Sequence, residues 1–434
     1  MSSTPSPILT EFSGRSGEIL ERLNKLYPAL IDLSLDRLVR LLNNLGNPER
    51  HMPHIIHVAG TNGKGSTCAF LRAIGEEAGL KVHVSTSPHL VDVTERFRIA
   101  GELVSEEELS ETLIEIERVN QQQPITVFEV LTAAAFILFA KHPADLAIIE
   151  VGLGGRFDAT NIIMPMVSVI TSVSMDHEAF LGDNLAKIAT EKAGIIKKNI
   201  PVIVDQQAPE ALTVIKETAI SLNAPYFIKD QEWSVTPTAN QLIYKDAKGC
   251  LELPLPSLLG QHQFRNAGLA IAALRNSNLP IPVQAYQGIA KAVWPARLQQ
   301  LHGKLTELVS HDSEIWLDGG HNPDAGKILA QLIQDKWQDK PLHLIVGMKD
   351  NKNVREYLAP LIPLSASIQA VVEPDQHLAM PISEIIKASD NYAISGGIVK
   401  EALSTLNKQS RSSAIRVLIC GSLYLAGSVL RQDQ

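Results

Sequence analysis

The stretch HVAGTNGKGS, from His57 to Ser66, has the residue types of a phosphate-binding loop. Its glycines let backbone N–H groups turn inward as an anion nest, and the amino end of a following helix adds partial positive charge. Lys64 stands where its ammonium would reach the outer phosphates of a nucleotide. A hydroxyl usually follows this lysine directly, whereas here Gly65 intervenes before Ser66. A glycine-rich turn with a solvent lysine is the alternative, and the flanking strand and helix patterns favour phosphate binding.

Further charged side chains follow apolar runs. Glu150 ends the run ADLAIIE, where an unpaired carboxylate would be costly; Mg²⁺ beside a nucleotide would stabilise it, and a buried salt bridge is the alternative. Asp176 and His177 end the run VSVITSVSMDH and are expected at the carboxyl end of another strand. There His177 is either a ligand or an ordinary hydrogen-bonding residue. Lys192, in the helical pattern ATEKAGI, has by local pattern alone the character of a solvated helix lysine.

A second group of candidates lies in WLDGGHNPDAG. Asp318, His321 and Asn322 fall on a predicted strand-to-helix turn, with Pro323 near the first helical position. Arg297 lies just upstream, at a predicted hinge. An arginine and an aspartate from a separate domain would be able to close over a nucleotide held by the first domain. A structural turn with a capping aspartate is the alternative.

These residues require a framework of parallel strands and helices. Expected strands are β-branched apolar runs that end in polar or glycine residues, at 54–60, 80–89, 144–155, 167–177 and 200–205. Ligands of open α/β sheets gather at such strand ends. A short meander is expected over 233–256, followed by a helix over 260–275. A new set of strand-then-polar units begins after residue 300, at 315–326, 342–353, 368–374 and 415–422, and predicts a second, smaller α/β domain.

The composition excludes several classes of protein. A net charge of -8 argues against a broad grip on nucleic acid. The three cysteines are far apart and lack metal-ligand spacing, which suits a reducing cytosol. The longest apolar run, Val130 to Ala140, is too short to cross a bilayer. The first 18 residues lack the pattern of a signal peptide and are expected to form an unstructured lead-in, so a cytoplasmic protein is predicted.

Taken in order, these stretches resemble the folylpolyglutamate synthase family, which is related to the ATP-dependent Mur ligases. The resemblance runs from about Ile31 to the C-terminus through HVAGTNGKGS, TSPHL, TERFRI, FEVLT, EVGLGGRFDATN, EKAGI, PAR, LDGGHNP and VLICGS. A glycine after the loop lysine is the folate branch's own form. The resemblance implies a P-loop-type, mostly parallel ATPase domain over residues 1–299 and a smaller Rossmann-like α/β domain over residues 300–434.

The resemblance also implies the roles of individual residues. The ATP phosphates would be bound by the loop residues Asn62, Gly63, Lys64, Gly65 and Ser66. Further nucleotide contacts would come from Asn266, Arg297 and Asp318. Ser87 and Glu150 would hold one Mg²⁺, and His177 a second. The pterin site would be lined by Phe128, Phe157, Asp158 and Ala159. Lys64, a carbamylated Lys192 and the interdomain His321 would be the catalytic residues.

The implied activity is an ATP-dependent amide ligase that works through an acyl phosphate. It would add L-glutamate to dihydropteroate and to the γ-carboxyl of reduced folates, as a monomer with small-molecule substrates and neither nucleic acid nor membrane as partner. A Mur-type ligase of peptidoglycan precursors is one alternative, against which Gly65 and TSPHL weigh. A non-catalytic ATP-binding protein is another, against which the polar strand ends of the second domain argue.

Overall fold

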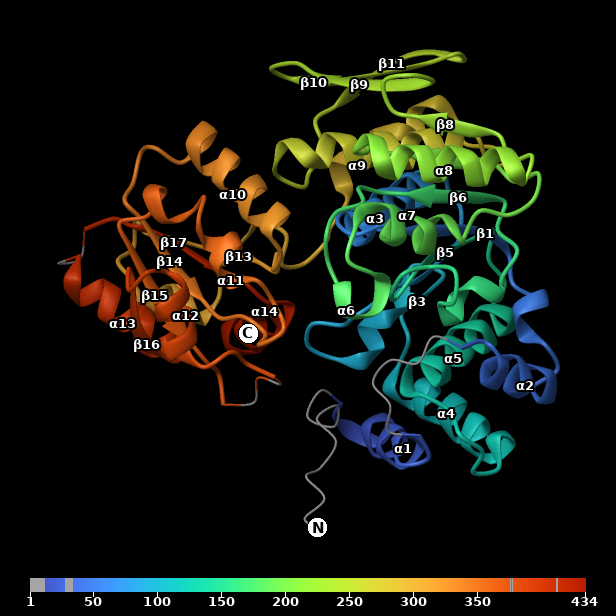
Figure 1. Cartoon of the computed structure of the whole chain (residues 1–434), viewed down its shortest axis with the longest axis horizontal. Coiled ribbons are helices and arrows are strands. Elements are labelled where there is room, and N and C mark those ends of the chain that lie inside the picture. The colour runs from blue at the N-terminus through green and yellow to red at the C-terminus, as the bar shows by residue number, and fades with distance from the viewer. Residues whose placement is uncertain (1–11, 28–33, 375, 377, 411–412) are drawn as a thin grey trace. The chain divides into compact units, whose positions relative to one another are not determined.

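The computed structural model describes residues 12–27, 34–374, 376, 378–410 and 413–434 (Figure 1). The chain forms two compact units. The N-terminal unit comprises Phe12–Leu258 and His262–Val293, and the C-terminal unit comprises Leu259–Gln261 and Trp294–Gln434. The predicted lead-in lies mostly outside the described residues. Its end is wrong, because helix α1 (Gly14–Asn24) already begins within it and buries Ile19 and Leu20.

An eight-stranded sheet forms the centre of the N-terminal unit, in the order β4-β3-β2-β5-β1-β6-β7-β8. Its strands are β1 (His54–Ala59), β2 (Val82–Ser85), β3 (Phe97–Ile99), β4 (Glu102–Leu103), β5 (Leu146–Glu150), β6 (Val167–Ile170), β7 (Val202–Val204) and β8 (Tyr226–Ile228). From β2 to β8 the neighbours pair in parallel, and β3 and β4 add an antiparallel edge. The carboxyl ends of six strands therefore meet at one edge of the sheet.

Helices cover both faces of this sheet. Those of the N-terminal unit are α1, α2 (Asp36–Asn44), α3 (Lys64–Glu77), α4 (Glu106–Asn120), α5 (Val127–Lys141), α6 (Glu178–Leu181), α7 (Leu185–Ala193), α8 (Pro209–Ser221) and α9 (Gln261–Arg275). Ile55 and Ile149 pack into a cluster with α5, α4, α1 and α2. A Cβ on Gly75 of α3 would lie 2.9 Å from Val82, on the other face. Both faces are buried, so β1 and β5 read as continuous apolar runs.

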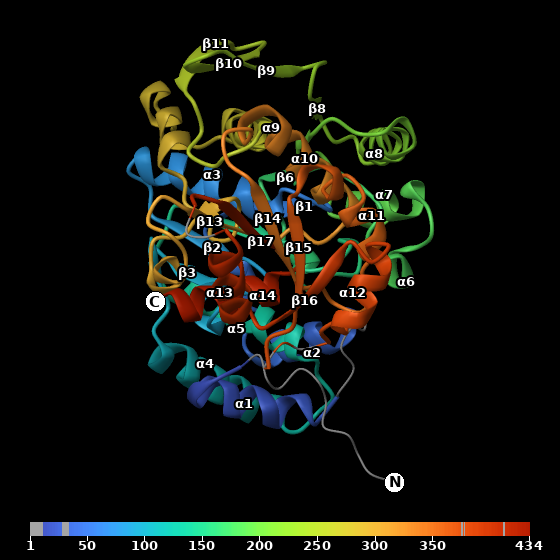
Figure 2. The same cartoon turned by 90° about the vertical axis from the view of Figure 1, so that its left-hand side faces the viewer.

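The predicted meander is confirmed as a three-stranded antiparallel sheet of β9 (Trp233–Pro237), β10 (Gln241–Asp246) and β11 (Gly249–Pro254). Both views show it as a layer beyond α8 and α9 (Figures 1 and 2). Arg275 at the end of α9 forms a 2.6 Å ion pair with Asp246 of β10. Gly268 lets α9 approach the meander, because a Cβ there would lie 2.7 Å from Trp233.

The C-terminal unit is built on a six-stranded sheet in the order β12-β13-β17-β14-β15-β16. Its strands are β12 (Gln299–Gln300), β13 (Glu314–Asp318), β14 (Leu342–Val346), β15 (Ser367–Val371), β16 (Ala393–Gly397) and β17 (Arg416–Cys420). Its helices are α10 (Pro323–Lys336), α11 (Val354–Leu358), α12 (Ile382–Ala388), α13 (Val399–Gln409) and α14 (Leu423–Asp433). All pairs are parallel except β12 with β13. The expected fold class, a large mostly parallel sheet plus a smaller α/β domain, is confirmed.

Short 3₁₀ helices connect these elements. They are η2 (Pro48–Arg50), η3 (Val93–Arg96), η4 (Ala159–Ile162), η5 (Val283–Lys291), η6 (Lys304–Leu308) and η7 (Ile362–Leu364).

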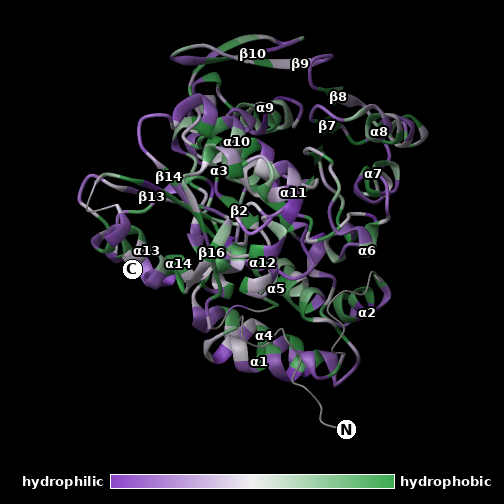
Figure 3. Cartoon of the chain, turned by 60° about the vertical axis from the view of Figure 1, so that its left-hand side comes forward, coloured by the Kyte–Doolittle hydropathy of each residue, from purple (hydrophilic) through white to green (hydrophobic). Residues whose placement is uncertain are grey.

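Hydrophobic residues concentrate in the strands and hydrophilic ones in the outer turns (Figure 3). In the described part of the chain no helix is long and apolar enough to cross a membrane.

A charged cluster lies at the amino ends of β13 and β17. Arg416 is 2.7 Å from Glu314 and 2.7 Å from Asp339, and Lys340 lies 2.7 Å from the second oxygen of Glu314. The Arg416 guanidinium is the main cause that lowers the pKa of Glu314 to about 2. Opposite charges are therefore matched within this cluster.

Two of the three cysteines are buried. Burial raises the pKa of the Cys68 thiol well above its usual range, and the nearby Glu150 carboxylate raises it further. Burial raises the pKa of Cys420 to about 12. Cys250 is exposed on β11 of the meander.

Candidate active site

The predicted phosphate-binding loop connects β1 to α3, as expected. Gly60 and Gly63 have φ angles of 147° and 91°, in the region that favours glycine. A Cβ on Gly60 would lie 1.8 Å from the Thr171 hydroxyl, and one on Gly63 would lie 2.5 Å from the Asn266 side-chain oxygen. Neither position has room for a side chain. α3 begins at Lys64, so the first helical N–H groups belong to the predicted loop itself.

Two lysines converge on one carbonyl at the start of this loop. The Nζ atoms of Lys64 and Lys192 lie 3.2 Å and 2.9 Å from the oxygen of Gly60. Lys192 is 4% exposed, and burial followed by the charge of Lys64 lowers its pKa to about 7. The local pattern of a solvated helix lysine is therefore wrong: α7 directs this side chain into the site.

Glu150, the last residue of β5, is 6% exposed. Its carboxylate lies 3.9 Å from Nζ of Lys64 and accepts a 3.3 Å hydrogen bond from the N–H of Ser87. Ser87 follows β2, the strand next to β5, and both residues line a small cavity of about 20 Å³ with Phe128 and Thr160. The structure thus brings together the predicted metal ligands Ser87 and Glu150.

This pair fits Mg²⁺ by its chemistry. Mg²⁺ prefers oxygen donors and usually keeps several waters, with one or two carboxylates and substrate phosphates completing its shell. Ser87 and Glu150 offer one hydroxyl and one carboxylate. No group of three or more His, Cys, Asp or Glu able to hold a metal is found among the described residues. An ion here would depend on water and phosphate for its other ligands, as expected beside a nucleotide.

The expected position of Asp176 and His177 is wrong. β6 ends at Ile170, and His177 instead precedes α6 with φ 53° and a side chain that is 38% exposed. The strand stops because the next residues bond to the phosphate-binding loop. The N–H of Thr61 donates to the Ser172 carbonyl at 2.8 Å, and the Thr61 hydroxyl donates to the Ser174 carbonyl at 3.0 Å.

The glycine loop that follows β5, residues 151–159, carries three of the predicted pterin contacts. Phe157 is 42% exposed and lies under the guanidinium of Arg156, 4.6 Å from its ring centre. Asp158 and Ala159 are buried. Phe128, on α5, packs against the start of the loop, since a Cβ on Gly152 would lie 2.3 Å from its ring.

The other side of this loop is fixed to the end of α7, which carries Lys192. Arg156 donates from its backbone N–H to the Glu191 carbonyl at 2.7 Å and from its guanidinium to the Glu191 carboxylate at 2.6 Å. A Cβ on Gly155 would lie 2.7 Å from the same carbonyl. These contacts therefore fix the position of the glycine loop relative to the end of α7, which carries Lys192.

Ser66 and Asn266 are joined through a residue that the sequence did not single out. The amide of Gln263 donates to the Ser66 hydroxyl at 3.2 Å, and its oxygen accepts from the Asn266 amide at 2.9 Å. All three side chains are buried. The amino half of α9 thus supports the phosphate-binding loop. Gln263 had no distinguishing local signal beyond being a polar residue on a helix with many alanines.

The remaining candidates lie together within the C-terminal unit. The Asp318 carboxylate accepts from the N–H groups of Leu298 (3.0 Å) and Gly320 (2.8 Å), and burial is the main cause that raises its pKa. Nδ1 of His321 lies 3.2 Å from the Gly319 carbonyl. The alternative of a capping aspartate does not hold for α10, because the Asn322 side chain caps it by accepting from the N–H of Ala325 at 3.0 Å.

Arg297 completes this group. Its guanidinium donates to the Ala296 carbonyl at 2.9 Å, and a Cβ on Gly319 would lie 2.9 Å from it. The turn after β13 therefore brings Arg297, Asp318 and His321 into one neighbourhood. A bulkier residue at Gly319 would displace the arginine.

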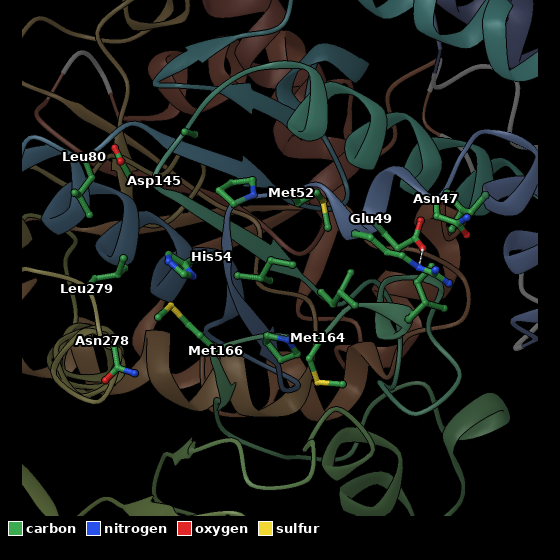
Figure 4. A pocket seen from close by; sticks show the side chains of 18 of the residues that line it. Asn47, Glu49, Met52, His54, Leu80, Asp145, Met164, Met166, Asn278 and Leu279 are labelled. Carbon is green, nitrogen blue, oxygen red and sulfur yellow. Dashed lines mark ion pairs between the residues drawn. The ribbon is translucent and has the colours of Figure 1, made fainter.

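A larger cavity, of about 1070 Å³, lies at the opposite, amino end of the N-terminal sheet (Figure 4). Met52, Met164 and Met166 line it, with His54 at the start of β1 and Asp145 just before β5. None of the predicted site residues contributes to it. This cavity and the predicted site residues therefore lie at opposite ends of the sheet.

Family comparisons agree with this geometry. Residues 58–274 match the Mur ligase middle domain, and residues 300–432 match the C-terminal domain of dihydrofolate synthetase. The fold and the site thus define an ATP-dependent ligase of the Mur ligase class.

Individual relatives identify the family within this class of ligases. The dihydrofolate synthase/folylpolyglutamate synthase of Bacillus subtilis is 34% identical over 92% of this chain and 94% of its own length. The structure of Escherichia coli FolC in complex with DHPP and ADP has a TM-score of 0.87 and 33% identity, covering 99% of both chains. The bifunctional enzyme of Yersinia pestis complexed with AMPPNP and a Mn ion has a TM-score of 0.84 and 31% identity, again over 99% of both. The chain belongs to the dihydrofolate synthase/folylpolyglutamate synthase family, and the family predicted from the sequence is confirmed.

Proposed function

We propose that this chain joins the amine of L-glutamate to the carboxyl of dihydropteroate, and to the γ-carboxyl of reduced folates, with ATP as the energy source. One observation carries the proposal: Lys64 and Lys192 converge on the Gly60 carbonyl beside the carboxylate of Glu150. Such a set of charges at the carboxyl end of a parallel sheet suits the binding and transfer of a phosphoryl group.

In the first step a carboxylate oxygen of the pteroate attacks the γ-phosphorus of ATP. The bond to the β-phosphate oxygen breaks, which leaves an acyl phosphate and ADP. The glycine-rich turn from Gly60 to Gly65 presents N–H groups to the phosphates, and Lys64 offsets the charge on the transferring group. Catalysis of this step is mostly positioning and electrostatic stabilisation.

In the second step the free amine of glutamate attacks the acyl carbon. The carbon–oxygen bond to phosphate breaks, inorganic phosphate leaves with the electron pair, and the nitrogen loses a proton. Water would hydrolyse the acyl phosphate in competition with the amine, so the site must exclude it. We assign Phe128, Phe157, Asp158 and Ala159 to the pterin site that holds the first substrate.

We assign Ser87 and Glu150 to one Mg²⁺ and His177 to a second. When bound, the metal compensates the negative charge of the phosphates. The oxygen ligands of the first pair support the assignment, as does the Mn ion in the Yersinia pestis complex.

We propose that Lys192 is carbamylated. Its lowered pKa leaves a substantial fraction of neutral amine near pH 7, which can react with carbon dioxide to give a carbamate and release one proton. The carbamate would replace two like charges at the Gly60 carbonyl with an opposite pair. Electron density at Lys192 tests this directly, since mass spectrometry can lose the group.

From the C-terminal unit we assign Arg297 and Asp318 to the nucleotide and His321 to catalysis. The domain boundary after residue 299 is supported by the start of the second family match at residue 300. We also propose a cytoplasmic monomer; size-exclusion chromatography with light scattering tests the oligomeric state.

The deciding experiment measures ADP release from ATP with L-glutamate and dihydropteroate. We expect release only when all three are present, with dihydrofolate as product. Turnover on a UDP-muramyl substrate instead would establish the Mur-type alternative. ATP binding without any substrate-dependent ADP release would establish the non-catalytic one.

A further inference from the structure

His57, the first residue of HVAGTNGKGS, is a fully buried polar side chain between Ile56 and Val58 of β1, whereas the other histidine of the strand, His54, is exposed at its start. It shares a face of β1 with Ile55, which packs toward α5. The family roles assigned above do not use it. A buried imidazole in the central strand needs a physical reason, because burying a polar group is costly unless it is hydrogen-bonded.

That reason is a chain of hydrogen bonds to the glycine loop. Nε2 of His57 lies 2.8 Å from the Thr160 hydroxyl, and that hydroxyl donates to Oδ1 of Asp158 at 2.5 Å. The hydroxyl has a single proton, which Asp158 receives, so His57 must be the donor to Thr160. The chain therefore fixes the imidazole as the tautomer protonated on Nε2.

The unprotonated Nδ1 agrees with this assignment. Among the described residues it has no hydrogen-bond partner, so no acceptor there competes for the ring proton. Burial, and then the charge of Lys197, lowers the pKa of His57 to about 3. The imidazole is therefore neutral near pH 7, and it supplies one N–H donor directed at the Thr160 hydroxyl.

Asp158 accepts the last hydrogen bond of this series and fixes the conformation of the glycine loop. It accepts from the N–H groups of Leu153 at 2.8 Å and of Thr160 at 3.0 Å, and from Gly152. Thr160 also lines the small cavity that contains Ser87 and Glu150. The loop conformation from Gly152 to Thr160 is thus tied to β1, three residues before Gly60.

We propose that His57 is a positioning residue that locks the glycine loop to the strand leading into the phosphate-binding loop. Through Thr160 and Asp158 it holds the pterin-facing part of the loop in register with the site where phosphoryl transfer occurs. The identity of the ligand that the loop binds rests on the proposed function. The connection between the loop and β1 rests on the hydrogen bonds alone.

The test is a set of matched variants. His57→Leu removes the donor at similar volume, His57→Gln keeps an N–H at about the same reach, and Thr160→Val removes the hydroxyl. We expect His57→Leu and Thr160→Val each to raise KM for dihydropteroate about tenfold while KM for ATP changes less than about twofold. His57→Gln should recover most of the loss. The double variant should resemble either single one, because both break the same chain.

A control separates positioning from general destabilisation. His83 is a buried histidine of β2, which β5 separates from β1 in the sheet, and its ring bonds to the His142 carbonyl at 2.9 Å, away from the loop. His83→Leu should lower stability yet leave KM for dihydropteroate unchanged. Additive losses in the double variant, or an equal rise of both KM values in His57→Leu, would overturn the proposal.

A second measurement stands apart from turnover. In His57→Leu the N–H groups of Gly152 and Leu153 should exchange with deuterium faster than in the wild type, while the amides of β5 stay protected. Should His57→Leu fail to fold, Thr160→Val and Thr160→Ser make the same comparison, with the serine expected to behave as wild type. Unchanged exchange would contradict the lock, whereas absent dihydropteroate turnover in the wild type would contradict only the proposed function.

Discussion

The two ends of the N-terminal sheet differ in what they bury. At the carboxyl end, Lys192, Glu150 and Asp158 are almost inaccessible, and the cavity that Glu150 lines has a volume of only about 20 Å³. At the amino end, a cavity of about 1070 Å³ is lined by methionines and prolines, and the Arg50 side chain there is 71% exposed. The carboxyl end buries several charged groups in little space. The amino end has much space, and the pair there combines an exposed Arg50 with Glu49, whose side chain is 11% exposed.

This difference indicates which physical feature distinguishes the candidate active site from the larger cavity. Burying a charged group costs free energy that folding alone does not recover, so such groups persist where a reaction or a ligand uses them. The convergence of two lysines on the Gly60 carbonyl is of this kind. The Arg416 cluster of the C-terminal unit shows the contrary case, since its opposite charges are matched. Buried charge that the chain does not fully match is the better guide.

The largest expected effect tests the carboxyl end directly. Lys64→Ala should lower kcat for ADP release about 10³-fold, because a preorganised positive charge at the transferring phosphoryl group is lost. Lys81→Ala, at an exposed lysine of the amino end, is the matched control and should retain wild-type kcat. Comparable kcat values for Lys64→Ala and wild type would contradict a role of the buried charges at the carboxyl end in phosphoryl transfer.

Lys192 gives the next effect, on stability. Its pKa of about 7 in the folded chain lies below its unfolded value, so between these two values the unfolded chain binds more protons and the free energy of unfolding rises with pH. In buffer freed of carbon dioxide, urea unfolding at increasing pH above 7 should show this rise in wild type relative to Lys192→Met. Parallel pH dependence in the two proteins would exclude Lys192 as the titrating group.

The matched cluster should affect stability and not turnover. Glu314→Gln should lower the free energy of unfolding by about 2 kcal/mol, because charge-assisted bonds to Arg416 and Lys340 are weakened. The pKa of Glu314 is lowered in the folded chain, so this contribution is present near neutral pH and is lost as pH falls from about 4.5 toward 2. Urea unfolding and kcat should be measured together; a large fall in kcat would contradict a purely structural role.

The smallest effect is expected at the amino end. Met164 is 69% exposed at the rim of the large cavity, so Met164→Ser should change kcat and both KM values by less than about twofold. A substantial change in turnover would mean that the cavity communicates with the site, and the contrast between the two ends would need revision.

Much of the framework could be predicted from the sequence because parallel strands buried on both faces leave long apolar runs. HIIHVA and LAIIE are such runs, and β1 and β5 coincide with them. β16 (Ala393–Gly397) was missed, since its two glycines and exposed positions give no apolar run. β8 (Tyr226–Ile228) was missed for another reason, because a run of three residues is too short to be recognised as a strand.

The site was less predictable where it depends on distant contacts. Position in a motif brought Glu150, Ser87 and Lys64 together correctly, but the burial of Lys192 depends on how α7 packs and not on its own pattern. The end of β6 was misplaced because its continuation bonds to the phosphate-binding loop, more than 100 residues earlier in the chain. The partners His57 and Thr160 are likewise 103 positions apart, and the only local signal was one polar residue inside an apolar strand.

The distribution of cysteines has a practical consequence. Thiol reagents attack the thiolate, which burial suppresses at Cys68 and Cys420, whereas Cys250 is open on the meander. A maleimide dye or a spin label should therefore attach to the natural sequence at this single position. Labelling at Cys250 would supply a spectroscopic probe on the N-terminal unit without any substitution in the residues that carry the chemistry.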